Sequence, residues 1–216
     1  MTIRHHPEDE FLLAHASGAG SEAVSLLVGT HLALCPECRG RVGAMEHIGG
    51  ALLADVAPAE MSASALSSAM ARLDELTEES SAQASDLSPP LIAPEPLRSY
   101  IHGDIDRVRW IPVGPGVSYR PLFTRDGERV QLIRTAPGAG VGTHTHRGEE
   151  LTLVLAGGFT DVTGSYRRGD LQTTTPEIVH RPVTDADGYC ITLAMTDAPL
   201  KFTNPVVGLL GKVFGF

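Results

Sequence analysis

The sequence predicts an α + β protein of two domains, a small helical bundle followed by an all-β domain of the jelly-roll class. Apolar residues recur at helical spacing as far as residue 79 and at strand spacing beyond residue 107. A polar, proline-rich stretch separates the two patterns. The second part also contains the hairpin signals Asp126-Gly127 and Asp187-Gly188. A chain of 216 residues is long enough to form a core in each part.

Four helices are expected in the first domain, which we place at residues 1–85. Acidic residues at 8–10 favour a helix start because they face the positive end of the helix dipole. Ser21 is a suitable N-cap for a second helix, and Cys35 and Pro36 suit the cap and first position of a third. Glycines inside that third helix each cost about 1 kcal/mol relative to alanine, so the bundle is marginally stable. The expected ranges are 7–16, 21–34, 35–53 and 57–79.

A histidine and two cysteines stand at metal-ligand spacing where the second expected helix meets the third. His31 precedes Cys35 by one helical turn, and Cys38 falls in the next helix's first turn, where the dipole favours thiolate. Imidazole and thiolate suit tetrahedral Zn²⁺, which needs a fourth ligand and would stabilise the bundle. His5 and His6 are both available, and their spacing does not decide between them. A redox Cys-x-x-Cys pair is the alternative, but such pairs normally follow a strand.

The spacer between the domains is placed at residues 86–98, inside a serine- and proline-rich run from Ser80 to Pro96. The all-β domain then takes residues 99–216 and ends in an apolar tail from Pro205, interrupted by glycines. We expect no helices in this domain. Its expected strands are residues 108–111, 117–123, 130–135, 151–155, 159–162, 179–184 and 189–195.

A second set of metal-ligand residues lies in the all-β domain, in the pattern Gly138-x5-His144-x-His146-x3-Glu150. His144 and His146 are two residues apart, so on a strand they point to the same face. Glu150 shares that face if the strand runs through, whereas Glu149 does not. Imidazole and carboxylate ligands suit Zn²⁺, Mn²⁺, Fe²⁺ or Ni²⁺, and ligand type does not choose among these ions.

Together the two motifs resemble the zinc-containing anti-sigma factors of bacteria, of the ChrR type in which the zinc domain is fused to a cupin barrel. The pattern from Gly138 to Gly157 matches the first cupin motif. The resemblance implies that His6 rather than His5 completes the zinc site. It also implies a second cupin motif, for which Gly169-Asp170-x5-Pro176-x3-His180 is the candidate. The histidine of this motif, His180, would be a further ligand of the barrel metal. This motif departs from the family because the usual glycine before the histidine is absent and the spacing is one residue short.

The resemblance further implies a cytoplasmic protein that binds a group IV (ECF) sigma factor in a 1:1 complex and blocks its access to RNA polymerase. Its first and fourth helices would help to clasp the sigma factor. It would not be an enzyme, and it would bind neither membrane nor nucleic acid directly. The barrel metal would be Zn²⁺ in first place, and the cupin would sense photo-oxidative stress, chiefly singlet oxygen.

The composition supports a partner that is not nucleic acid. Residues 1–86 contain 13 acidic and 4 basic residues, a net charge of −9, whereas residues 87–216 are neutral overall. An acidic surface repels nucleic acid and attracts a basic partner, although it can also serve only for solvation. No apolar run reaches the roughly 20 residues of a membrane span, and no secretory signal is present. Three cysteines give no disulfide framework, which fits a reducing cytoplasm.

Two other functions are compatible with these motifs. A cupin can be a metalloenzyme, such as a dioxygenase or an isomerase, or it can serve only for dimerisation. The fused helical domain argues against an enzyme because no small-molecule reaction needs it. The oxidisable pair Cys35 and Cys38 is a rival to the cupin as the sensor. Cys190 is interpreted as a small buried apolar residue, with a redox role beside the metal as the alternative.

Overall fold

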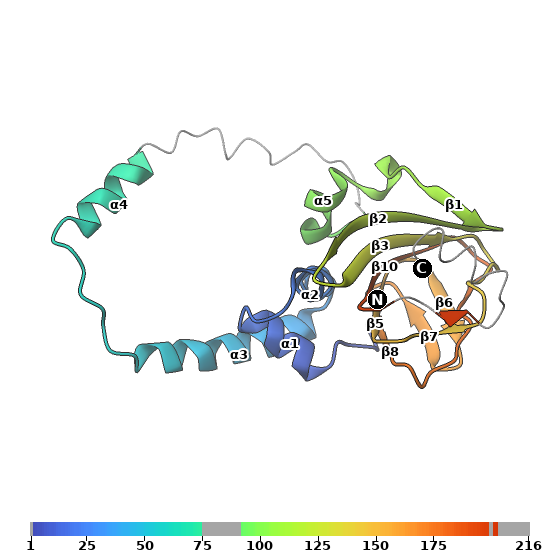
Figure 1. Ribbon diagram of the computed structural model, residues 1–216, viewed down its shortest axis with the longest axis horizontal. Coiled ribbons are helices and arrows are strands. Elements are labelled where there is room, and N and C mark those ends of the chain that lie inside the picture. The colour runs from blue at the N-terminus through green and yellow to red at the C-terminus, as the bar shows by residue number, and fades with distance from the viewer. Residues whose placement is uncertain (1, 75–91, 199–200, 203–216) are drawn as a thin grey trace.

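The computed structural model describes residues 2–74, 92–198 and 201–202 (Figure 1). Residues 86–91 of the predicted spacer and the apolar tail from Pro205 lie outside the described residues. Within the described part, no helix combines the length and the apolarity that a membrane span requires.

Three helices form the N-terminal bundle: α1 (Asp9–Ala16), α2 (Glu22–Leu34) and α3 (Pro36–Ala54). The Oγ of Ser21 accepts a hydrogen bond from the backbone N–H of Val24 (3.1 Å) and so caps α2. The Sγ of Cys35 accepts from the backbone N–H of Cys38 (3.4 Å) and caps α3, and Pro36 takes the first helical position. Both predicted caps are confirmed.

The fourth helix, α4 (Ala65–Asp74), begins later than the predicted start at residue 57. The carbonyl groups of Ser62 and Ser64 accept the first bonds of this helix, from Ala65 N–H (3.0 Å) and Ser68 N–H (2.9 Å). Serines favour caps and turns over helix interiors because their hydroxyl groups compete for nearby backbone groups. The helix starts after Ser62 and Ser64, although it includes Ser67 and Ser68, and its predicted end lies outside the described residues.

Only the first half of α3 packs against the bundle. Cys38 and Val42 are buried there, whereas Ile48, Leu52 and Leu53 further along the helix are exposed. Figure 1 shows α3 running outward from the body of the molecule, with α4 farther out still.

The C-terminal domain is built from antiparallel sheets. The largest has six strands in the order β1-β2-β3-β10-β5-β8, a second has the order β7-β6-β9, and β11 pairs with β4. These antiparallel sheets form the barrel that the sequence predicts. The strands are β1 (Ile111–Gly114), β2 (Val117–Arg125), β3 (Glu128–Thr135), β4 (His144–Thr145), β5 (Glu150–Ala156), β6 (Gly158–Asp161), β7 (Gly164–Arg167), β8 (Leu171–Thr174), β9 (Val183–Thr184), β10 (Cys190–Thr196) and β11 (Lys201–Phe202).

The long buried strands were predicted and several short ones were not. β3, β5 and β10 agree with the predicted ranges, whereas the predicted strand at 179–184 shrinks to β9. The predicted strand at 108–111 is displaced to β1, and three strands were missed, namely β7, β8 and β11. Strands of two to four residues are too short to show an alternating apolar pattern, so the sequence does not reveal them.

Helix α5 (Glu95–Ile101) corrects two expectations, that the spacer reaches residue 98 and that no helix follows it. Leu97 of α5 is fully buried, and the helix packs against α2. The hydroxyl of Tyr100 donates a hydrogen bond to Glu22 Oε1 of α2 (3.0 Å). A helix of seven residues is unstable alone and depends on such packing, which local sequence does not show. A 3₁₀ turn at Ile105–Arg107 then leads into β1.

Helix α2 joins the two domains because it packs on the six-stranded sheet, against β3, β5 and β10. Leu27 of α2, Leu132 of β3 and Leu193 of β10 are fully buried members of one continuous core. The bundle and the barrel therefore share a core, although the sequence pattern separates them.

Candidate metal centres

The first candidate centre lies where the N-terminal segment, α2 and α3 meet. One ligand atom from each of His6, His31, Cys35 and Cys38 lies within 4.8 Å of the other three. His6 Nδ1 is 3.5 Å from Cys35 Sγ and 3.3 Å from Cys38 Sγ. His5, the alternative from the sequence, packs against the barrel instead. The four residues form a group that could hold a metal ion.

His31 is oriented for metal binding by a backbone carbonyl of the barrel. Its Nδ1 lies 2.9 Å from the carbonyl oxygen of Gly169. A carbonyl only accepts hydrogen bonds, so Nδ1 carries the proton and Nε2 keeps its lone pair. This Nε2 is buried without a hydrogen-bond partner among the described residues. Burial, opposed by the Gly169 carbonyl, lowers the pKa of His31 to about 4, so the ring is neutral as a metal ligand must be.

The two thiols of this centre are buried and are not joined in a disulfide. Burial and the neighbouring Cys35 raise the pKa of Cys38 to about 12 in the absence of a metal. A bound cation reverses this effect because it stabilises the thiolate. Two thiolates and two imidazoles are a common ligand set of tetrahedral structural zinc sites. The donor set therefore fits Zn²⁺.

The second candidate centre lies inside the barrel. One ligand atom from each of His144, His146, Glu150 and His180 lies within 4.8 Å of the other three, and all four residues are buried. His180 reaches this position through an antiparallel bridge, in which its backbone exchanges two hydrogen bonds with His144 (3.0 and 3.1 Å).

Glu150 points inward, but not for the reason given by the sequence. The parity argument assumed one strand running from His144 through Glu150, whereas β4 ends at Thr145 and β5 begins at Glu150. The intervening turn is held by the side chain of Asp197, whose Oδ1 accepts a hydrogen bond from Glu149 N–H (2.7 Å). Thr174 on β8 lies 3.5 Å from Glu150 Oε2.

Three imidazole nitrogens converge in this centre. His180 Nε2 is 3.0 Å from His144 Nε2 and 3.1 Å from His146 Nε2. The Nδ1 of His144 donates to the carbonyl of Gly142 (2.7 Å), so its Nε2 presents a lone pair. Facing lone pairs at this distance repel unless a cation lies between them. Nitrogens bound to one ion at about 2.0–2.1 Å lie roughly 3.0–3.4 Å apart, which the observed spacing fits.

Burial disfavours the charged forms of three residues of this centre in the absence of an ion. Burial lowers the pKa of His144 to about 4 and that of His146 to about 3, the latter with help from the neighbouring imidazoles. Burial also raises the pKa of Glu150 to about 7. A divalent cation would favour the neutral rings as ligands and the ionised carboxylate as their counter-charge.

Asp161 on β6 is a functional residue that the sequence analysis missed. Its Oδ2 lies 2.7 Å from His180 Nδ1, an arrangement that fixes the ring and leaves Nε2 for the metal. Burial alone would raise the pKa of Asp161, but hydrogen bonds from His180, Thr163 and Gln172 outweigh burial and hold it well below its usual value. Its position follows from the barrel topology and has no spacing signature.

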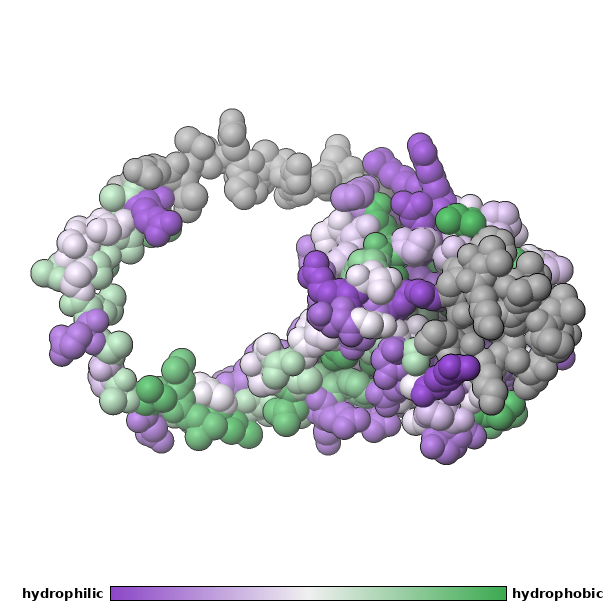
Figure 2. All heavy atoms as spheres, viewed as in Figure 1, coloured by the Kyte–Doolittle hydropathy of each residue, from purple (hydrophilic) through white to green (hydrophobic). Residues whose placement is uncertain are grey.

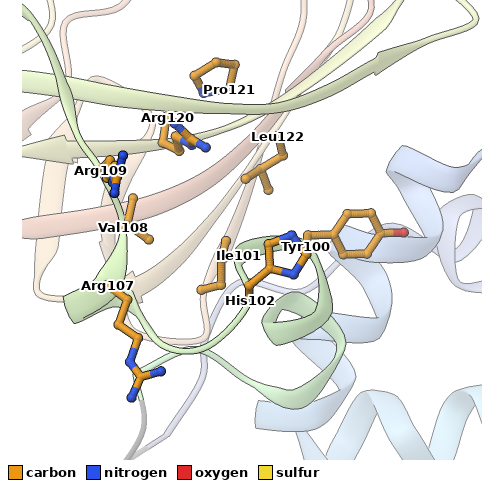
Figure 3. Close-up of a pocket in the computed structure, with 9 residues that line it drawn as sticks. All are labelled: Tyr100, Ile101, His102, Arg107, Val108, Arg109, Arg120, Pro121 and Leu122. Atoms are coloured by element: carbon orange, nitrogen blue, oxygen red, sulfur yellow. The ribbon is translucent and has the colours of Figure 1, made fainter.

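A cavity of about 330 Å³ lies apart from both centres, beside α5 and β2 (Figure 3). None of the eight ligand residues lines it. Its lining combines three arginines and a histidine with mostly apolar side chains and consists of Tyr100, Ile101, His102, Arg107, Val108, Arg109, Arg120, Pro121 and Leu122.

Comparison with known proteins agrees with this architecture. The family model described as the ChrR cupin-like domain matches residues 98–198. The anti-sigma-E factor ChrR of Cereibacter sphaeroides is 43% identical over 215 residues, which cover 99% of each chain. The crystal structure of Rhodobacter sphaeroides SigE in complex with the anti-sigma ChrR matches with a TM-score of 0.78 and 41% identity. That match covers 90% of this chain and 99% of the solved one.

Proposed function

This chain belongs to the ChrR family of anti-sigma factors, and on that premise we propose that it binds one group IV (ECF) sigma factor and keeps it from RNA polymerase. The identity of 43% over 99% of both chains places it in the family. The solved relative was crystallised in complex with a sigma factor, SigE, which supports a sigma factor as the partner here.

One observation of the structure carries the proposal, an exposed apolar surface on the outer half of α3 and on α4, called here the α3–α4 surface. On α3 it includes Ile48, Leu52 and Leu53, which are 63%, 66% and 72% exposed; on α4 it includes Leu66 and Met70, at 75% and 53%. Figure 2 shows hydrophobic residues gathered at the outer end of α3. Scattered exposed leucines need no explanation, but a group on two projecting helices marks a protein-binding site.

The charge of the N-terminal part favours the same kind of partner. Residues 1–86 have a net charge of −9, so the helices that present the α3–α4 surface belong to an acidic region. Sigma factors contact DNA and polymerase through basic surfaces, which an acidic inhibitor can cover. This proposed function places the protein in the cytoplasm with RNA polymerase.

The first centre would hold Zn²⁺ and fix the direction in which α3 leaves the bundle. Its ligands come from the N-terminal segment (His6), from α2 (His31) and from the start of α3 (Cys38). Because only the first half of α3 has packing partners in the bundle, an ion at that end positions the exposed outer half.

For the barrel we propose a second divalent ion, Zn²⁺ in first place with Mn²⁺, Fe²⁺ or Ni²⁺ as alternatives, and a sensory role. Photo-oxidative stress, chiefly singlet oxygen, would act on the barrel and release the sigma factor. An ion held there can polarise an incoming oxidant. Oxidation of Cys35 and Cys38 is the rival mechanism, but it gives the ligand group inside the barrel no function.

An enzymatic role for the barrel is not supported. The relative that matches over the full length is an anti-sigma factor, and a dioxygenase or isomerase would have no need of the fused helical bundle. We therefore assign the chain a regulatory role without catalysis.

Substitution on the α3–α4 surface tests the proposal. Leu53→Gln should weaken binding of a group IV sigma factor from the same genome by about tenfold or more, as expected for an apolar anchor. Val162→Gln is the matched control because Val162 is 77% exposed on the barrel, against 72% for Leu53. Binding is measured by titration, with both metals verified. If the two variants bind the sigma factor with equal affinity, the α3–α4 surface is not part of the binding interface.

A further inference from the structure

The N-terminal segment that carries His6 is attached to the barrel rather than to the helical bundle alone. The backbone N–H groups of Arg4 and His5 both donate to Asp170 Oδ1, at 2.7 and 3.0 Å. The carbonyl of His5 accepts from the N–H of Leu171 (3.0 Å). The first-centre ligand His6 therefore directly follows a residue whose backbone is held on both sides by the barrel.

A second ligand of the same centre is held by the same turn of the barrel, residues 167–171, called here the Asp170 turn. His31 Nδ1 donates to the carbonyl of Gly169. Asp170 is 2% exposed, and its Oδ2 accepts from Arg167 N–H (2.8 Å), which fixes the turn itself. Two of the four N-terminal ligands are thus positioned by one short segment of the barrel.

The side chain of His5 continues this attachment toward the barrel interior. Its ring packs on Tyr166 of β7, with ring centroids 4.4 Å apart. The hydroxyl of Tyr166 lies 2.9 Å from Thr163 Oγ1. Thr163 Oγ1 donates to Asp161 Oδ1 (2.7 Å) and accepts from Gln172 Nε2 (2.7 Å). Because the threonine's single proton is used, the tyrosine must be the donor in their bond.

The same aspartate orients a ligand of the second centre. Asp161 Oδ2 accepts from His180 Nδ1 (2.7 Å) and from Gln172 Nε2 (2.8 Å). Gln172 follows Leu171, which binds the His5 carbonyl, so β8 provides a parallel connection. A continuous series of contacts therefore joins the two centres, from His180 through Asp161, Thr163 and Tyr166 to His5.

We propose that this series of contacts couples the two metal centres, so that a change at the barrel ligands alters how firmly His6 holds the N-terminal metal. Asp161 and Tyr166 act as positioning residues. If the His180 ring moves, Asp161 must rearrange, and the fully used hydroxyl of Thr163 has to break a bond to follow it. Tyr166 and the His5 ring resting on it then lose their fixed position. Only the biological role of this coupling, as the route from the sensor to the sigma-binding domain, rests on the proposed function.

The coupling can be measured without a sigma factor. The readout is the rate at which Cys35 and Cys38 are alkylated in the full-length, metal-loaded protein, because metal-bound thiolates react slowly until the ion leaves. Peptide mass spectrometry separates these cysteines from Cys190. The barrel centre is perturbed by Glu150→Gln, or by His146→Asn if the first variant does not fold. We expect either change to accelerate alkylation by about fivefold or more, the lower end of ordinary coupling between sites.

Tyr166→Phe tests the route because it keeps the ring that packs on His5 and removes only the hydroxyl. In the Tyr166→Phe background the effect of Glu150→Gln should fall below twofold. Tyr100→Phe is the matched control, since it removes a hydroxyl that joins α5 to α2 outside the route, and it should leave the effect at its full size.

Two results would overturn the inference. One is an unchanged alkylation rate in both barrel variants, which would show that the centres are independent. The other is a full effect of Glu150→Gln in the Tyr166→Phe background, which would place the coupling elsewhere. Neither result depends on whether the chain binds a sigma factor, so failure of the coupling and failure of the proposed function remain distinguishable.

Discussion

Replacing Cys38 by serine should remove one of the two metal ions proposed here and unfold a defined part of the helical bundle. Structural Zn²⁺ contributes about 10–16 kcal/mol in zinc-finger peptides near neutral pH, more than any core side chain. α1 buries only Phe11 and Leu12, and α3 buries only Cys38 and Val42, so neither helix has a large core of its own.

The unfolding should not extend to α2. This helix of 13 residues packs on the six-stranded sheet, and its Leu27 and Val28 are fully buried. We therefore expect the 8 residues of α1 and the 19 of α3 to lose protection while α2 keeps it. Metal analysis measures the number of bound ions, far-ultraviolet circular dichroism measures the helix content, and hydrogen exchange by mass spectrometry measures the protection of each helix.

Cys190→Ser is the control for this substitution because Cys190 is a buried thiol of β10 outside both ligand groups. It should keep two ions per chain and full protection of α1 and α3. Full metal content together with full protection in Cys38→Ser would refute the assignment of Cys38 as a structural metal ligand. Loss of α2 together with α1 and α3 would refute the shared core.

Three further outcomes are expected. Added salt should weaken sigma-factor binding, since residues 1–86 have a net charge of −9. An affinity independent of salt would show that the acidic surface serves only for solvation. Asp104→Asn should destabilise the chain by about 1–3 kcal/mol at pH 7, as thermal or denaturant unfolding measures, because Asp104 accepts hydrogen bonds from the N–H groups of Ile92 and Ala93. Burial opposes these bonds, but together they lower the pKa of Asp104, so the difference between the two proteins should persist above about pH 4 and vanish on further acidification. The double variant His144→Ala, Glu150→Ala should show no further release of the sigma factor when singlet oxygen is added in transcription assays, and normal release would favour the cysteines as sensor.

The sequence predicts most of the two ligand groups because their members lie close together along the chain. The spacing of His31, Cys35 and Cys38 depends only on helix geometry and a cap, and both features are local. His144 and His146 likewise need only a short extended segment. His5 and His6 could not be separated in this way, since contacts with Asp170, 165 and 166 residues further along the chain from His5 and Arg4, determine which ring faces the thiols.

The features that the sequence did not predict are long-range contacts. Asp170 was recognised only as part of a cupin motif, yet it holds the N-terminal segment, and Asp161 has no motif at all. Helix α5 depends on packing against α2, and the apolar face of α2 serves the sheet as well as the bundle. A periodic apolar pattern shows that a face is buried but not which partner buries it.

The central claim is that this chain sequesters a sigma factor in a 1:1 complex. The most direct test mixes the purified 22.9 kDa chain, with both metals bound, with candidate group IV sigma factors from the same genome and measures the mass of the eluting species by light scattering. We predict one complex with the summed mass of one chain and one sigma factor, together with loss of transcription from that factor's promoter. Separate elution of every candidate at micromolar concentration, with transcription unaffected, would contradict the claim.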